Sequence, residues 1–446
     1  MANAIETNDD ETRPKAHIDS ITNGDLSTSP SPLVVPTQSA ASPIANCSDL
    51  PVELLELVFW PIRPVLEVKK SISIDDIKDY NRELKHYADL RLSCRIWHQV
   101  ITPILYEDVA LGITPKTQLQ NIADLFSENA DHFRSIIVFG EGRITSTDFS
   151  SSIALPEGAA EVIGRGLGLC TRLHDLQLYA NHPTFTSRWW LPKLAPTLSS
   201  TVTSLVISPH PRSPDLSRSL VGLGRTLEHL EILGWNRDYR SPPARFHLPA
   251  KFPKLTHLTL RDGYPSLQDI DNLLSRIANQ KPCPLRSFLI FDIPDLTNHI
   301  TTMLTYKNLG RYLTTFHFRR DWHGEPPNST IPIAIMRLCP NLIDFSYLLF
   351  TKKDLFDCLS LSLRHLELLA WPMNPNFTLS LNDFAQFLRT RRCRALKTLS
   401  IVSCAGAFLT PTPAPGLDSE TALRSVCRDL DAQITFKEAG SVLITL

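Results

Sequence analysis

The feature that most limits what this chain can fold into is a short apolar motif that recurs along most of its length. In each copy an apolar residue is followed by two variable residues, a second apolar residue, one variable residue and a third apolar residue. A repeat at a period of 20 to 50 residues indicates stacked units rather than one closed core. The nine copies, which start 21 to 33 residues apart, are Leu173/Leu176/Leu178, Val202/Leu205/Ile207, Leu227/Leu230/Ile232, Leu255/Leu258/Leu260, Leu285/Phe288/Ile290, Leu313/Phe316/Phe318, Leu342/Phe345/Tyr347, Leu363/Leu366/Leu368 and Leu396/Leu399/Ile401. An earlier copy is expected at Phe133/Ile136/Val138.

Each copy alternates inward and outward residues, which is the pattern of a short β-strand. Between copies, apolar residues recur at helical spacing, as in Leu267-Ile270-Leu273-Leu274-Ile277 and Leu381-Phe384-Phe387-Leu388. One strand and one helix cannot cover their own apolar face, so neighbouring units must stack. The sequence therefore predicts an α/β fold in which a curved parallel sheet has its helices on the outside.

The strand motif resembles that of the leucine-rich repeat. This resemblance applies to residues 107–446 and implies an irregular leucine-rich-repeat solenoid. A last helix at 421–430 and a last strand at 434–436 are expected to close the array.

The outward positions of the predicted strands form a candidate binding surface, because they line the concave sheet of a solenoid. Aromatic and arginine residues follow several of the strands, and such residues are typical anchors of protein interfaces. The alternative is that these aromatics cover turns. The candidate substrate-binding residues are Tyr179, His229, Glu231, Trp235, His257, Arg261, Tyr264, His317, Arg319, Trp322, His365, Glu367 and Trp371.

The segment from Leu50 to Phe59 is too apolar for a short surface helix. Seven of its ten residues are apolar, and they surround almost the whole helix, leaving Glu53 and Glu56 for water. Leu54, Leu57 and Val58 share one side, together with Leu50, while Leu55 and Phe59 lie on another. A helix of this kind is buried on more than one side, and one of those sides is expected to face another protein.

The pattern Leu-Pro-x-Glu-Leu-Leu-x-x-Val-Phe is followed by Leu-Arg-Leu-x-Cys-Arg-x-Trp-His and Pro-x-Leu-Tyr. Over Ser48 to Tyr106 this order resembles the F-box of fungal proteins. In that family the F-box binds a small Skp-type adaptor, which a cullin scaffold with a RING subunit holds in turn. The resemblance implies adaptor contacts at Leu50, Pro51, Leu54, Leu57, Val58, Leu92, Cys94, Ile96 and Trp97. Of these residues, Trp97 is expected to belong to the core of the module more than to the adaptor-binding surface.

Three segments follow from these patterns. Residues 1–45 are rich in Ser, Thr, Pro, Asn and Asp and are predicted to be disordered. Residues 46–106 form the F-box-like helical module, and residues 107–446 form the repeat array with its C-terminal cap.

The module contains an insert at about 60–88, where an F-box usually has a short connection. Within the insert, Ile77, Tyr80, Leu84 and Tyr87 recur at helical spacing, which predicts a helix from Ser73. The spacing allows this helix to continue through residues 90–97. The next helix or turn is expected near residue 103.

Composition excludes several classes of function. Lys and Arg number 45 against 46 Asp and Glu, so the chain has no basic excess for nucleic acid. The nine cysteines form no CxxC pair, which indicates reduced thiols in the cytosol or nucleus. No apolar run approaches eighteen residues, and the acidic N-terminus is unlike a signal peptide. We expect no membrane partner.

No enzymatic constellation emerges either. There is no G-x-S-x-G elbow and no P-loop, and the run Gly164-Arg-Gly166-Leu-Gly168 is interpreted as a helix end with glycines that permit a tight turn. Three histidines occupy equivalent outward positions, but only His229 and His257 are in adjacent repeats and no carboxylate or thiolate lies between them. Solvated histidines are therefore expected instead of metal ligands, and no catalytic residue or cofactor is predicted.

Two functions remain. The first, implied by the resemblance, is a non-catalytic substrate-recognition subunit of an SCF-type ubiquitin ligase (Skp-type adaptor, cullin, F-box protein). Its repeats would bind an unknown target protein. The second is a leucine-rich-repeat scaffold or binding protein with no role in ubiquitination, whose F-box-like helices serve as an N-terminal cap.

Overall fold

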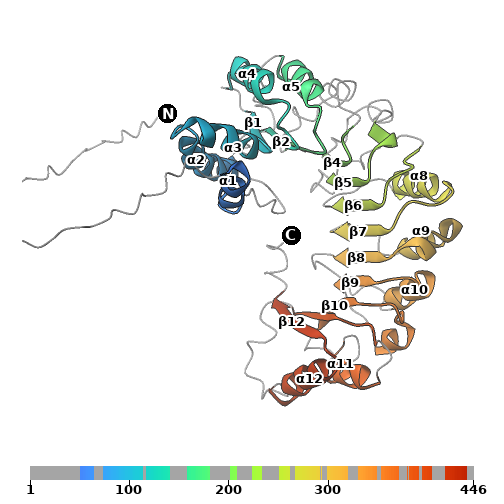
Figure 1. Cartoon of the computed structure of the whole chain (residues 1–446). Helices are drawn as coiled ribbons and strands as arrows, with labels where there is room; N and C mark the ends of the chain where they lie inside the picture. Colours follow the sequence, from blue (N-terminus) through green and yellow to red (C-terminus); the bar gives the residue numbers. More distant parts are fainter. Residues whose placement is uncertain are drawn as a thin grey trace, which may run out of the picture. The chain divides into compact units, whose positions relative to one another are not determined.

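The computed structural model describes residues 51–64, 74–113, 117–140, 158–180, 201–207, 223–233, 251–261, 267–291, 293, 299–319, 330–348, 353–370, 379, 381–390, 394–403 and 417–438. All described residues belong to one compact unit, Leu50–Leu446 (Figure 1). The predicted disordered segment 1–45 lies outside the described residues, as does Leu50.

Among the described residues, three helices precede the repeats: α1 (Val52–Phe59), α2 (Ile74–Leu90) and α3 (Arg95–Leu105). Their shared core contains Leu55, Phe59, Tyr87, Val100, Ile101, Ile104 and Leu105. The ring of Phe59 meets those of Tyr87 and Trp97 edge to face, at centroid distances of 6.3 and 5.0 Å. Tyr87 Oη also donates to the carbonyl of Phe59 at 2.8 Å. The aromatic contacts tie α1 to both other helices.

Two predictions for this region are wrong. The helix of the insert does not continue through Cys94 and Trp97, because α2 ends at Leu90 and a turn separates it from α3. Cys94 is the N-cap of α3, and its Sγ accepts from Trp97 N at 3.5 Å, which satisfies a donor of the first turn. Pro103 begins no helix but lies inside α3.

The described residues of the array form one sheet of twelve strands, all parallel and ordered as in the sequence (Figure 1). The strands are β1 (Asp108–Ile113), β2 (Ser135–Gly140), β3 (Asp175–Ala180), β4 (Ser204–Ile207), β5 (His229–Leu233), β6 (His257–Arg261), β7 (Ser287–Phe291), β8 (Thr315–Arg319), β9 (Asp344–Leu348), β10 (His365–Ala370), β11 (Thr398–Ser403) and β12 (Gln433–Glu438). The predicted fold class is thus confirmed: this is an α/β, leucine-rich-repeat-like solenoid.

The register aligns the predicted apolar motifs from strand to strand. Leu205 pairs with Leu230, and Leu230 with Leu258, so equivalent motif positions form continuous buried rows. One strand was missed, since β1 uses the variant Tyr106/Val109/Leu111, of which Val109 and Leu111 pair with Ile136 and Val138. Its first position is a tyrosine that the sequence had assigned to the preceding module.

Helices and 3-10 turns lie between the strands and cover one face of the sheet, as α8, α9 and α10 do in Figure 1. They are α4 (Leu119–Asn129), α5 (Ala159–Leu169), η3 (Leu223–Arg225), α8 (Leu267–Ala278), α9 (Ile300–Thr305), η5 (Tyr306–Tyr312), α10 (Ile331–Leu338), η6 (Lys353–Cys358), α11 (Leu381–Arg389) and α12 (Leu417–Asp429). A single large core fills the space between helices and sheet. The predicted closing helix and strand correspond to α12 and β12.

The glycine run lies in the last part of α5, which ends at Leu169, so its expected place at a helix end is confirmed, but its role is not a tight turn. Gly164 and Gly166 lie inside α5 and are buried. A Cβ added to Gly166 would lie 2.3 Å from the ring of Phe126 on α4. The glycine therefore permits close packing of two helices instead of a tight turn.

One hydrogen-bond pattern recurs at the start of the strands from β2 to β11. The carbonyl oxygen just before a strand accepts two backbone N–H groups from the start of the next strand, at 2.7–3.0 Å. The acceptors are Glu107, Arg134, His174, Thr203, Glu228, Thr256, Arg286, Thr314, Ile343 and Arg364. These bonds align the first residues of successive strands.

Among the described helices, none has both the length and the apolar character needed to cross a membrane.

Candidate functional site

The first candidate surface is an apolar patch on α1 and the turns beside it. The α1 patch comprises Val52, Leu54, Leu57, Val58, Trp60, Ile62 and Leu92, all of them exposed. Leu57 and Leu92 are 70% and 72% exposed, whereas Leu55 on the opposite side of α1 is 2% exposed. Burial of Leu55 and Phe59 in the module core leaves the other side of a largely apolar helix in water. Exposed apolar surface of this kind is typical of interaction sites.

The structure places the predicted adaptor-binding residues in two environments. Pro51, Leu54, Leu57, Val58 and Leu92 are exposed, and all but Pro51 belong to the α1 patch.

Cys94, Ile96 and Trp97 are half-buried. Cys94 caps α3. Trp97 packs on Phe59 of the module core, where it was expected. The sequence reading omitted Val52, Trp60 and Ile62, although their apolar character beside the predicted face was a usable signal.

A hollow of about 420 Å³ adjoins the α1 patch. Leu57, Trp60 and Ile104 line it on the side of the module, and Arg134 and Arg172 line it from the turns before β2 and β3. It extends the α1 patch toward the array.

The second candidate surface is the open face, meaning the side of the sheet that carries the outward positions of the strands. Register puts the first outward residues in one row: Asp175, Ser204, His229, His257, Ser287, Thr315, Asp344, His365 and Thr398. A second row contains Gln177, Val206, Glu231, Thr259, Leu289, His317, Ser346, Glu367 and Ser400. Most of these side chains are polar, as expected of a face that meets water or a partner.

Four candidate histidines lie on this face. His229 and His257 are exposed and stacked, with ring centroids 4.1 Å apart and planes at 9°. Burial and the neighbouring His229 lower the pKa of His257, while Glu228 acts in the opposite direction. His317 Nε2 lies 3.0 Å from Asp344 Oδ1 on the next strand. His365 Nδ1 lies 2.6 Å from Thr398 Oγ1.

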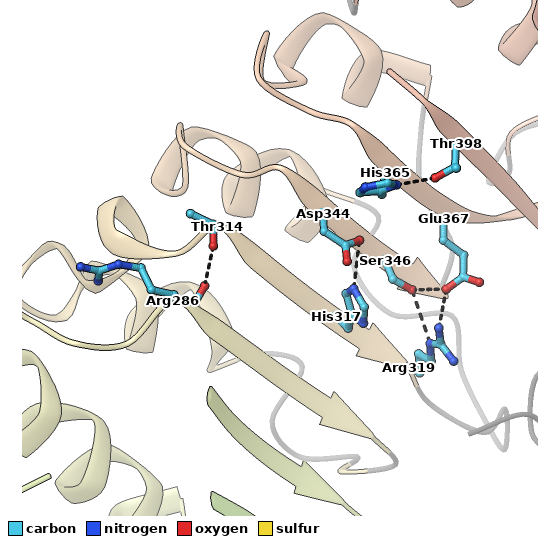
Figure 2. A network of polar contacts seen from close by, with 9 residues as sticks. All are labelled: Arg286, Thr314, His317, Arg319, Asp344, Ser346, His365, Glu367 and Thr398. Carbon is cyan, nitrogen blue, oxygen red and sulfur yellow. Dashed lines mark hydrogen bonds and ion pairs between the residues drawn. The ribbon is translucent and has the colours of Figure 1, made fainter. Parts of the chain in front are cut away.

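A polar network joins β8, β9 and β10 (Figure 2). Arg319 Nη2 and Ser346 Oγ both donate to Glu367 Oε2, each at 2.6 Å. The side chains of Arg319 and Glu367 are only 14% and 10% exposed. The network therefore holds both charges in fixed positions on the open face, close to the strands.

Arg261 makes an equivalent pair on the other side, where its Nε lies 2.9 Å from Glu231 Oε1. Between the two arginines is Phe291, whose ring centroid is 4.9 Å from the Arg261 guanidinium and 5.7 Å from that of Arg319. Phe291 was not a sequence candidate, because it directly follows the last apolar residue of its motif. Five strands thus share an ordered row of glutamate, arginine and phenylalanine side chains.

The insert contributes to the open face as well. Tyr80 of α2 shares a buried cluster with Ala110, Ile137 and Val206, which are outward residues of β1, β2 and β4. Its Oη donates to the carbonyl of Asp108 at 3.0 Å. The first strands are therefore covered by a helix of the same chain.

The remaining aromatic candidates cannot be placed. Tyr179 belongs to β3, but its side chain lies outside the described residues, and so do Trp235, Tyr264, Trp322 and Trp371. Within the described part of the chain, no three His, Cys, Asp or Glu residues are grouped so as to hold a metal ion.

The chain was compared with known families, curated proteins and solved structures. No family model matches the chain, and no curated protein matches it. Among solved structures, the leucine-rich repeat-containing protein LegL7 from Legionella pneumophila is 16% identical, with a TM-score of 0.38. The match covers 74% of this chain and 90% of that one. The fold assignment rests on the strand order and register described above.

Proposed function

We propose that the chain is a non-catalytic substrate-recognition subunit of an SCF-type ubiquitin ligase. The α1 patch would bind the Skp-type adaptor, through which the cullin and RING subunits are recruited. The open face would bind the protein to be modified. Such a subunit acts by raising the effective concentration of the target near the ubiquitin-conjugating enzyme, and needs no active site of its own.

The observation that carries this proposal is the exposure of Leu54, Leu57 and Val58 together with Leu92. These residues come from the two parts of the sequence that resemble the F-box, and the fold brings them to the surface while Leu55 and Phe59 form the core. An exposed apolar side on a helix whose other side is already packed has a natural use in binding another protein.

The second half of the proposal concerns the array. Its open face has rows of fixed polar side chains, and extended concave sheets of stacked repeats commonly bind proteins. The half-buried arginines beside Phe291 are the residue types that dominate binding energy at interfaces.

Co-purification of the full chain with a Skp-type adaptor and cullin tests the adaptor assignment. We expect Leu57→Asp/Val58→Asp to abolish co-purification, because both side chains are exposed in the α1 patch. Leu361→Asp is the control, since Leu361 is at least as exposed as Leu57 and Val58 but precedes β10. Adaptor binding that survives the double substitution would overturn the proposal. If adaptor and cullin co-purify with the wild-type chain, a second purification with the proteasome blocked would identify the target proteins.

A second function is favoured by a specific observation. Arg63 and Tyr80 connect the helical module to the first strand, as an N-terminal cap of a repeat array would. The chain would then be a leucine-rich-repeat scaffold or binding protein without a role in ubiquitination. Absence of adaptor from the purified complex, with other proteins retained by the open face, would favour this alternative.

A further inference from the structure

Helix α2 reaches beyond the helical module to which it belongs. Tyr80 and Tyr87 are seven residues apart, so they lie two turns apart on one side of the helix. Tyr87 packs in the module core and donates to Phe59 O. Tyr80 instead contacts the array: its side chain is 5% exposed and donates to Asp108 O. One face of α2 thus serves two hydrophobic clusters.

The array residues in the Tyr80 cluster belong to the open face. In the parallel register, Ala110 pairs with Ile137, which is followed along the same row by Gln177 and Val206. All are second-row outward positions. Ala110, Ile137 and Val206 are buried in the Tyr80 cluster, and Thr259 and Leu289 farther along the row are half-buried. Ser346 and Glu367 of the same row are buried as well, but in their own polar network with Arg319. The open face is therefore already occupied over its first strands.

Arg63, which follows α1, makes a second connection at the same place. Its Nη1 lies 3.1 Å from Glu107 Oε2 and its Nη2 lies 2.9 Å from Asp108 Oδ2. Arg134 also pairs with Glu107, at 2.9 Å. With a side-chain exposure of 13%, Arg63 is held between module and array. Burial, and to a lesser extent the nearby Asp108 carboxylate, raises the pKa of Tyr80 to about 12.

We infer that α2 is a fixed internal occupant of the open face, which joins the helical module to the first strands as one cooperative unit and leaves the strip from β5 to β11 for a partner protein. The exposed first-row residues of that strip, His229, His257 and His365, mark where it is uncovered. If the proposed function holds, Tyr80 and Arg63 are also positioning residues, because they set where a bound target stands relative to the adaptor.

Hydrogen exchange of the full chain, followed by mass spectrometry, tests the coupling. Tyr80→Phe removes only the hydroxyl, and we expect amides of 108–113 and 135–140 to exchange about fivefold faster together with those of α2, the effect of losing one hydrogen bond. Amides of β8 to β11 should be unchanged. Tyr306→Phe, at an exposed tyrosine of η5, is the matched control. Faster exchange confined to 74–90 would overturn the inference.

A second measurement addresses coverage of the open face. Tyr80→Ala should expose Ala110, Ile137 and Val206 and increase the fluorescence of an added apolar dye such as ANS, whereas Tyr306→Ala should not. Unchanged fluorescence would contradict coverage by α2. If Tyr80→Ala unfolds the module, the hydrogen-exchange measurement on Tyr80→Phe still tests whether α2 and the first strands are coupled. Adaptor co-purification should be unaffected by Tyr80→Phe, so failure of the proposed function is seen separately.

Discussion

Arg319 and Glu367 meet across an intervening strand: they lie on β8 and β10, and Ser346 of β9 donates to the same carboxylate oxygen. Both charges are largely shielded from water. Breaking such a pair leaves an uncompensated charge, so Glu367→Gln should lower the free energy of unfolding by about 3 kcal/mol. Urea denaturation measures the change.

Two controls sharpen this first prediction. Arg319→Met/Glu367→Leu removes both charges and should cost less than Glu367→Gln alone. Asp431→Asn breaks the exposed pair with Lys397 and should have no measurable effect. Equal costs for all three variants would show that the central pair contributes nothing special.

The stacked histidines predict acid sensitivity. The pKa of His257 is lowered in the fold, so the unfolded chain takes up this proton first, near pH 6.5. The contribution to stability is complete above that pH and is lost as pH falls through the lower folded pKa. His257→Gln should reduce the fall in urea midpoint between about pH 7 and pH 5. His98→Gln, at an exposed position of α3, should leave it unchanged.

Gly166 predicts a steric effect. Gly166→Ala places a methyl group against the ring of Phe126, and the forced repacking should cost about 1–3 kcal/mol of unfolding free energy. Gly168→Ala in the same helix is the control, since Gly168 is exposed and alanine is the better helix former by about 1 kcal/mol. Thermal unfolding should therefore separate the variants in opposite directions. Identical shifts would contradict the packing argument.

Adjacent leucines of α1 should behave differently. Leu55→Ala removes a buried side chain from the module core and should destabilise the module by about 2–5 kcal/mol. Leu54→Ala, on the exposed side, should change stability by less than about 0.5 kcal/mol. Circular dichroism during denaturation distinguishes them. A large loss for Leu54→Ala would mean that its side chain has an intramolecular role.

Much of the fold was predictable because apolar positions within a strand are set by a period of two. The register turned those predicted positions into continuous rows, as for Leu205, Leu230 and Leu258. Strand β1 was not predicted, because the tyrosine at the first motif position, Tyr106, indicates the repeat motif less clearly than a leucine does. The break between α2 and α3 after Leu90 was not predicted, because the apolar spacing continued through the turn. Ser93-Cys94 was nevertheless a usable signal of a helix N-cap.

The candidate sites were only partly predictable. Sequence periodicity assigns Tyr80 to a helix face but does not say what that face contacts, which depends on how the chain returns to the sheet. Arg319 and Glu367 were singled out separately, yet their pairing requires side chains that reach across β9. Two-residue periodicity identifies outward positions, whereas pair formation between them depends on rotamers and register together.

The doubly accepting carbonyls at the strand starts bear on how this array tolerates insertions and deletions. Successive strands begin as few as 21 residues apart, from Asp344 to His365, and as many as 40 apart, from Ser135 to Asp175. The strands from β2 to β11 nevertheless start from the same hydrogen-bonded position. Length changes are therefore absorbed after one strand ends and before the next turn begins. Repeats of such different length therefore present their side chains at the same level along the open face, so loop length and surface chemistry are free to diversify independently.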